Sequence, residues 1–165
     1  IIPEGILVSS AEGEFLCSLK GALKQEKSRM KNLVAVGDCV RFEKSAGREG
    51  SIAKIEPRKS ILSRADNLSR KKEQLIAVNI DQVFITASVV SPRLKPFLID
   101  RYIIAAHKGN MEPILLINKI DLFDSPPSEI GPQELQEEKE LYEELLRVYR
   151  DLGITTIAVS TETSE

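Results

Sequence analysis

Apolar and polar residues alternate over short stretches in the first half of the chain, and glycine-containing turns separate these stretches. This spacing is typical of half-buried β-strands joined by tight turns. Five short strands with glycine turns fit a small barrel of the OB type, so we predict an all-β OB-type barrel over residues 1–75. The predicted strands cover residues 5–10, 15–19, 34–42 (with a turn or bulge at Gly37 and Asp38), 51–55 and 60–63.

From residue 76 onward, nearly continuous apolar runs alternate with segments of helical periodicity. Such runs are typical of parallel strands that are buried on both faces, and their alternation with helices predicts an α/β domain. In the helix predicted over residues 133–152, we expect a buried stripe of Leu141, Leu145, Val148 and Leu152. We expect a solvated acidic face of Glu134, Glu137, Glu138, Glu140, Glu143 and Glu144 on the same helix. The predicted strands are 82–90, 113–117 and 154–159, and the predicted helices are 97–108 and 133–152.

Charge divides the chain in the same way. Residues 1–80 hold 15 basic and 10 acidic residues, net +5, whereas residues 81–165 hold 8 and 15, net −7. A basic β-domain attracts phosphates without sequence preference, so an RNA contact through the backbone is one interpretation and a solvated basic face is the other. The lysine-rich segment 21–32 leaves the same two alternatives open. The candidate RNA-binding residues are Arg58, Lys59, Arg64, Arg70, Lys71 and Lys72.

Other features of the sequence narrow the class of protein. No apolar run approaches the roughly 20 residues of a membrane span, so we expect no membrane partner. Cys17 and Cys39 lie far apart and form neither a C-x-x-C pair nor a metal-ligand set. We expect each to be a small buried apolar side chain in a protein of the reducing cytoplasm. Because the chain begins with Ile1 rather than methionine, we expect further residues before it.

The most informative stretch is Asn118-Lys119-Ile120-Asp121, which follows an apolar strand directly. Ligands of open α/β sheets bind at the carboxyl ends of strands. A guanine edge offers two neighbouring donors, the ring N1–H and the exocyclic amine, and the single carboxylate of Asp121 can accept both. Asn118 would tie neighbouring loops together, and the stem of Lys119 would lie along the base or the sugar, with its ammonium near solvent. The alternative is a surface turn that matches the N-K-x-D pattern by chance.

A second group, Ser160-Thr161-Glu162, follows the last predicted strand. The order of elements matches the second half of a Ras-type G domain, in which a Ser-Ala-Lys-like loop offers backbone N–H groups to the guanine carbonyl. A GTPase also needs a phosphate loop, but the chain contains no Gly-Lys-Ser or Gly-Lys-Thr. Either the domain is not a GTPase, or it is circularly permuted and its phosphate-binding half follows Glu165.

The second explanation fits a known family. The chain resembles the ribosome-small-subunit-dependent GTPase A family (RsgA, YjeQ-type), which joins an OB-like barrel to a circularly permuted P-loop GTPase domain. The stretches that carry the resemblance span nearly the whole chain. They are residues 36–38, 57–60, 62–64, 77–83, 100–102, 118–122 and 159–160.

The resemblance implies a monomeric, cytoplasmic GTPase that binds GTP and GDP. Its hydrolysis would be stimulated by the small (30S) ribosomal subunit late in maturation, and its barrel would contact rRNA. Residues 76–165 would be the guanine-recognising half of the G domain, ending before the phosphate loop. Mg²⁺ would bind with the missing phosphate site, and Zn²⁺ would bind in a missing C-terminal domain.

We therefore expect no catalytic residue and no metal ligand in these 165 residues. The expected guanine-binding residues are Asn118, Lys119, Ile120, Asp121, Ser160, Thr161 and Glu162. The alternative function is a non-enzymatic OB-fold RNA-binding module with an α/β scaffold.

Overall fold

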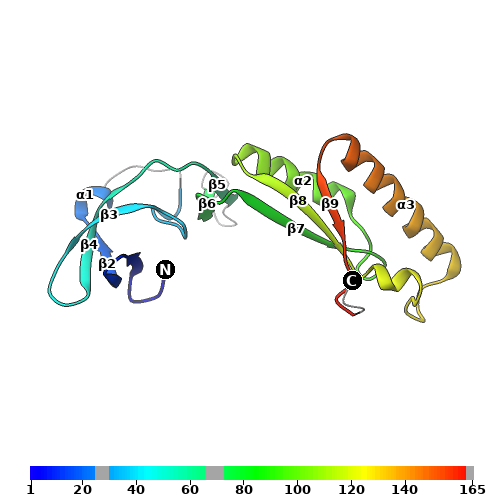
Figure 1. Ribbon diagram of the computed structural model, residues 1–165, viewed down its shortest axis with the longest axis horizontal. Helices are drawn as coiled ribbons and strands as arrows, with labels where there is room; N and C mark the ends of the chain where they lie inside the picture. Colours follow the sequence, from blue (N-terminus) through cyan, green and yellow to red (C-terminus); the bar gives the residue numbers. More distant parts are fainter. Residues whose placement is uncertain (25–29, 66–72, 163–165) are drawn as a thin grey trace. The chain divides into compact units, whose positions relative to one another are not determined.

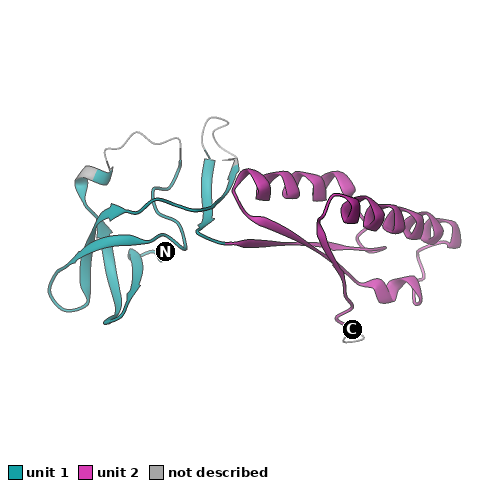
Figure 2. Cartoon of the chain, turned by 45° about the horizontal axis from the view of Figure 1, so that its top comes forward, with its two compact units in different colours: residues 1–80 teal, residues 81–165 magenta. Residues whose placement is uncertain are grey.

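The computed structural model describes residues 1–24, 30–65 and 73–162. The chain divides into two compact units, Ile1–Ile80 and Asp81–Glu165, shown in two colours in Figure 2. Three candidate RNA-binding residues, Arg70, Lys71 and Lys72, lie outside the described residues, as do residues 25–29 of the lysine-rich segment 21–32.

The first unit contains a four-stranded sheet and a separate hairpin (Figure 1). The strand order in the sheet is β1-β2-β4-β3, with β2 and β4 parallel and the other pairs antiparallel. Its core gathers Phe15, Cys17 and Ile52, and the ring of Phe42 lies 5.2 Å from that of Phe15. The elements are β1 (Ile6–Ser10), β2 (Gly13–Leu19), α1 (Gly21–Lys24), β3 (Val40–Lys44), β4 (Glu49–Ile55), and the hairpin β5 (Ile61–Ala65) and β6 (Glu73–Val78).

The predicted barrel is not closed. Within the part of the chain that the structure describes, β1 and β3 are the outer strands of an open sheet, and β5 pairs only with β6. The sequence identified most of these strands but not their order in the sheet. β2 pairs with β1 on one side and in parallel with β4 on the other, and β4 is not the next strand in the sequence.

The expected strand over residues 34–42 is wrong in its first half, because β3 begins only at Val40. Asp38 instead closes a turn, since its carboxylate accepts the backbone N–H of Ala35 at 2.8 Å. Gly37 has a φ of +93°, and a Cβ there would lie 2.1 Å from the carbonyl oxygen of Val78, so only glycine fits this approach. Cys39 follows the turn and is exposed, contrary to the expectation of a buried side chain.

The second unit is a three-stranded parallel sheet in the order β7-β8-β9. The alternation predicted from the apolar runs is confirmed, with element ends shifted by one or two residues. The elements are β7 (Gln82–Ser88), α2 (Pro96–Lys108), β8 (Glu112–Asn118), the 3₁₀ helix η1 (Ile120–Phe123), α3 (Pro132–Asp151) and β9 (Thr155–Ala158).

Both long helices cover the same face of this sheet (Figure 2). Alternate strand residues point to opposite faces, so Ile85 and Leu115 enter one core with helix residues such as Leu145. The opposite face carries Phe84 and Ile157 on the outer strands, and these side chains are 58% and 42% exposed. Among the described residues, that face has no helix over it.

The buried stripe of α3 differs from the expected one. The buried side chains are Glu138, Leu145 and Tyr149, whereas Val148 and Leu152 are exposed. These three positions share a helix face because they are seven and four residues apart, which is about two turns and one turn of helix. Glu138 therefore does not belong to the solvated acidic face, and the reason is that loop groups hold its carboxylate.

Tyr149 connects the two helices through a hydrogen bond of 2.7 Å from its hydroxyl to the Asp100 carboxylate. Burial, together with the hydrogen bond and negative charge of Asp100, raises the pKa of Tyr149 well above its usual value. The neutral phenol is therefore favoured more strongly in the folded than in the unfolded state. Its stabilisation is complete below the unfolded pKa of about 10 and is lost as the pH rises beyond it.

Replacing Tyr149 with phenylalanine is expected to lower the free energy of unfolding by about 1 kcal/mol at pH 7, because one hydrogen bond to a partly solvated carboxylate is lost. The wild-type protein should lose stability between pH 9 and pH 11, and Tyr149→Phe should lose less over the same interval. Urea unfolding followed by circular dichroism at several pH values measures both effects. If the free energy of unfolding fell equally in the two proteins between pH 9 and pH 11, Tyr149 would not be the cause of the alkaline loss of stability.

Candidate functional site

The Asn-Lys-Ile-Asp quartet begins at the last residue of the central strand β8. Asn118 ends the strand, and its side-chain oxygen accepts the Lys119 N–H at 2.7 Å. Lys119 then adopts a left-handed conformation, with φ of 66° and ψ of 34°, which is uncommon for a residue other than glycine. The chain turns there into η1, so Asp121 lies in the first turn of that helix beside the carboxyl end of the sheet.

The end of β9 meets this quartet. Ser160 is buried, and its hydroxyl donates a hydrogen bond of 2.6 Å to Oδ1 of Asp121. The backbone N–H of Ile120 points to the carbonyl of Val159 at 3.4 Å, and Glu162 N–H contacts the Ser160 hydroxyl at 3.3 Å. The structure therefore brings together the two motifs that the sequence selected separately.

A third segment, the loop between β7 and α2, completes the site. The ammonium of Lys119 donates to the carbonyl oxygen of Ser91 at 2.6 Å, and Val89 N–H donates to the carbonyl oxygen of Asn118 at 3.2 Å. The sequence did not single out this loop. The sequence signals that mark a loop here are Pro92 and Pro96, and Pro92 follows Ser91 through a cis peptide bond.

This arrangement can recognise a flat heterocycle with paired donors. Asp121 is half-buried, so its carboxylate is oriented by Ser160 while part of it still faces solvent. Thr161 and Glu162 are exposed and follow Ser160 at the same end of the sheet. A carboxylate for two donors and a loop of backbone N–H groups for a carbonyl are the complement of a guanine edge.

The candidate RNA-binding residues differ in their surroundings. The guanidinium of Arg58 lies inside the first unit, where Nε and Nη2 donate to the two oxygens of Asp38 at 2.7 and 2.9 Å. Nη2 also donates to the Leu33 carbonyl at 2.7 Å, and the side chains of Arg58 and Asp38 are only 17% and 1% exposed. Lys59 and Arg64 are exposed, and Arg64 contacts Gln74 on the neighbouring strand.

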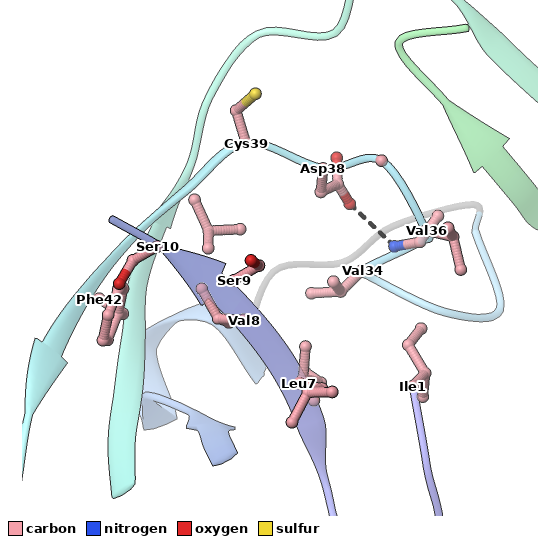
Figure 3. Close-up of a pocket in the computed structure, with 14 residues that line it drawn as sticks. Ile1, Leu7, Val8, Ser9, Ser10, Val34, Val36, Asp38, Cys39 and Phe42 are labelled. Carbon is pink, nitrogen blue, oxygen red and sulfur yellow. Dashed lines mark hydrogen bonds between the residues drawn. The ribbon is translucent and has the colours of Figure 1, made fainter. Parts of the chain in front are cut away.

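A cavity of about 540 Å³ lies in the first unit between β1 and residues 34–42 (Figure 3). Most of its lining is apolar and includes Leu7, Val8 and Phe42. The dashed line in Figure 3 is the bond from Ala35 N–H to Asp38, whose carboxylate also holds Arg58. The acidic group at this cavity is thus already occupied by structural contacts.

The described residues contain neither a cluster of metal ligands nor a membrane-spanning helix. Across 1–24, 30–65 and 73–162, no three His, Cys, Asp or Glu side chains gather closely enough to hold a metal ion. In the same ranges, no helix is both long enough and apolar enough to cross a membrane.

Comparison with known proteins gives consistent matches. The model of the family described as RsgA GTPase matches residues 55–165. A protein of Actinobacillus succinogenes named small ribosomal subunit biogenesis GTPase RsgA is 35% identical over 163 residues, which cover 96% of this chain and 40% of that protein. A protein of the same name from Chlorobaculum parvum is 37% identical over 139 residues, covering 79% of this chain and 40% of its own length.

Solved structures agree with these matches. The crystal structure of YjeQ from Thermotoga maritima superposes with a TM-score of 0.63 at 26% identity, covering 95% of this chain and 48% of that one. YloQ, described as a circularly permuted GTPase, gives a TM-score of 0.59 at 25% identity, covering 94% of this chain and 47% of its own. The chain thus spans between about 40% and 50% of the length of these four relatives.

Proposed function

The chain belongs to the RsgA GTPase family, and from this premise we propose that it supplies guanine recognition to a GTP-binding and GTP-hydrolysing factor of small-subunit ribosome maturation. The observation that carries the proposal is the hydrogen bond from Ser160 to Asp121, which joins two predicted guanine loops in one site. The names of the relatives support the ribosomal role.

In this proposal each site residue has one task. Asp121 pairs with the two donors of guanine, and Ser160 orients its carboxylate. Asn118 holds the turn through Lys119 N–H, and the Lys119 stem packs along the nucleoside while Ser91 holds its ammonium. Residues 160–162 form the loop beside the guanine carbonyl, to which Thr161 offers its backbone N–H, whereas Glu162 N–H contacts the Ser160 hydroxyl at 3.3 Å.

We further propose that the phosphate loop, the Mg²⁺ ligands and the groups that position the attacking water follow Glu165 in the whole protein. The helix-free face of the second unit supports this idea, because the exposed Phe84 and Ile157 would be covered by further polypeptide. Mg²⁺ would there neutralise charge on the transferred phosphate. A zinc-binding domain, as the family resemblance implies, would likewise lie outside these residues.

The first unit is proposed to contact rRNA in a cytoplasmic, monomeric factor, with Lys59 and Arg64 as phosphate contacts. Arg58 is better explained as a structural residue, since its guanidinium is held by Asp38 and Leu33. The net charge of +5 on residues 1–80 is the observation that favours RNA binding by this unit.

The 165-residue chain alone is expected to bind guanine nucleotide weakly and to release no phosphate from GTP, because most of the affinity and all of the chemistry depend on phosphate and Mg²⁺ contacts. The full-length protein should bind GDP and hydrolyse GTP faster when small subunits are added. Fluorescent GDP titration and phosphate release measure both. Turnover by the short chain would refute the division of roles. Failure of the full-length protein to bind GDP would refute the GTPase proposal and favour a purely RNA-binding module.

A further inference from the structure

Glu138, on α3, is a buried carboxylate whose position affects more than the packing of the hydrophobic core. Only 1% of its surface is exposed, although it lies on a helix whose other acidic side chains are mostly at the surface. Burying a carboxylate is costly unless several donors hold it. The donors that hold Glu138 identify what it does.

All three donors come from the loop between β7 and α2, more than 40 residues earlier in the chain. Oε1 accepts the backbone N–H groups of Leu94 at 2.5 Å and Val90 at 3.4 Å. Oε2 accepts Nε of Arg93 at 3.1 Å. The loop needs such support, because Val90 has a φ of +65°, a conformation that is costly for a β-branched residue.

The same loop contacts the candidate guanine motif through two backbone atoms. The Ser91 carbonyl accepts the Lys119 ammonium at 2.6 Å, and Val89 N–H donates to the Asn118 carbonyl at 3.2 Å. Ser91 lies between Val90 and Leu94, the two residues whose N–H groups Glu138 holds. The position of the Lys119 ammonium therefore depends on a loop that is anchored by α3.

We infer that Glu138 is a positioning residue for base recognition: it fixes the loop over residues 89–94, and this loop fixes the side chain of Lys119. The inference rests on the proposed guanine-binding function. Its physical basis is preorganisation, since a lysine already held along the base loses less side-chain freedom on binding than a free one. A role in stability alone would not require the loop to contact the motif.

The test uses the full-length protein and measures GDP affinity for two variants of similar size. Glu138→Leu removes the acceptors and is expected to weaken GDP binding about tenfold, since two buried N–H groups lose their partner. Glu138→Gln keeps one acceptor oxygen and should stay within about threefold of wild type. Tyr149→Phe, on the same helix, controls for general destabilisation and should leave the affinity unchanged.

A double-mutant cycle with Lys119→Met separates positioning from stability. If Glu138 acts through Lys119, Glu138→Leu should cost little once Lys119 has been replaced. Equal losses in both backgrounds, or unchanged GDP binding by folded Glu138→Leu, would overturn the inference while leaving the proposed function intact. If the wild-type protein binds no GDP, the proposed function fails as well.

Should Glu138→Leu not fold, Arg93→Met takes its place in the cycle, because it removes one donor from the Glu138 carboxylate, together with exposed ion pairs to Glu134 and Glu137, without changing the sequence of α3. It is expected to weaken GDP binding about threefold in the wild-type background and not in Lys119→Met. An equal effect in both backgrounds, or none in either, would overturn the inference.

Discussion

Replacing Asp121 with asparagine is expected to change the base preference of the full-length protein from guanine to xanthine. The asparagine side chain offers one acceptor and one donor where the carboxylate offers two acceptors, so it mismatches the two donors of guanine. Xanthine has a carbonyl in place of the exocyclic amine and restores the match. Affinity for GDP should fall at least about 10³-fold, because sites that lose paired buried hydrogen bonds discriminate on this scale or more.

Competition by unlabelled GDP or XDP measures this change, with a fluorescent guanine nucleotide as the probe for the wild type and a fluorescent xanthine nucleotide as the probe for Asp121→Asn. Asp124→Asn is the matched control, since Asp124 lies three residues later, at the end of η1, and is exposed. The control should keep the wild-type preference. An Asp121→Asn protein that is folded and still prefers GDP would exclude Asp121 as the residue that reads the base.

Replacing Asp38 with alanine is expected to lower the free energy of unfolding of the first unit by about 3–5 kcal/mol, because the Arg58 guanidinium would remain buried without its partner. The N–H of Ala35 would lose its acceptor as well, and with it the turn around Gly37. A loss of this size is a large part of the stability of a small domain.

Hydrogen–deuterium exchange followed by mass spectrometry can locate the loss of stability in Asp38→Ala, and this loss should be confined to residues 1–80. Glu12→Ala is the matched control because it removes a carboxylate from an exposed ion pair with Lys44 in the same unit. Exposed pairs contribute about 0–1 kcal/mol, so this variant should resemble wild type. Similar exchange in the two variants would mean that the Arg58–Asp38 pair has no special role.

The sequence predicted the second unit well because its signals are local. A buried parallel strand needs apolar residues on both faces, and this requirement alone located β8 to within one residue at each end. The periodicity of Leu98, Ile99 and Ile103 likewise located α2. In the structure each long helix begins at a proline, Pro96 in α2 and Pro132 in α3, one residue before the start that the periodicity predicted.

The failures share one cause, which is that distant partners decide them. Whether residues 34–39 extend a strand or form a turn depends on Arg58, some 20 positions later, which holds Asp38. The buried face of α3 depends on loop N–H groups that donate to the Glu138 carboxylate, although the pattern had placed Glu138 on the solvated acidic face. Whether the sheet closes into a barrel depends on the order of its strands, and this order cannot be deduced from local periodicity.

The candidate site likewise combines features that local sequence predicts with contacts that depend on distant residues. The residue types of the quartet and of Ser160-Thr161-Glu162 pointed to one chemistry, and their places at strand ends followed from the pattern. The contact from Ser160 to Asp121 depends on the register between β8 and β9, in which Ile117 lies beside Ala158. The Ser91 contact of Lys119 depends on a loop that carries no recognisable motif.

The uncovered sheet face has a practical consequence for the isolated 165-residue chain. Within the ranges that the structure describes, both outer strands, β7 and β9, present apolar side chains beside unpaired edges, a combination that promotes edge-to-edge association. Weak nucleotide binding is usually measured at high protein concentration, but at high concentration this surface would promote association of the chains. Ligand-observed NMR, with nucleotide in large excess over a few micromolar protein, meets both conditions and is the format in which the isolated chain should first be assayed.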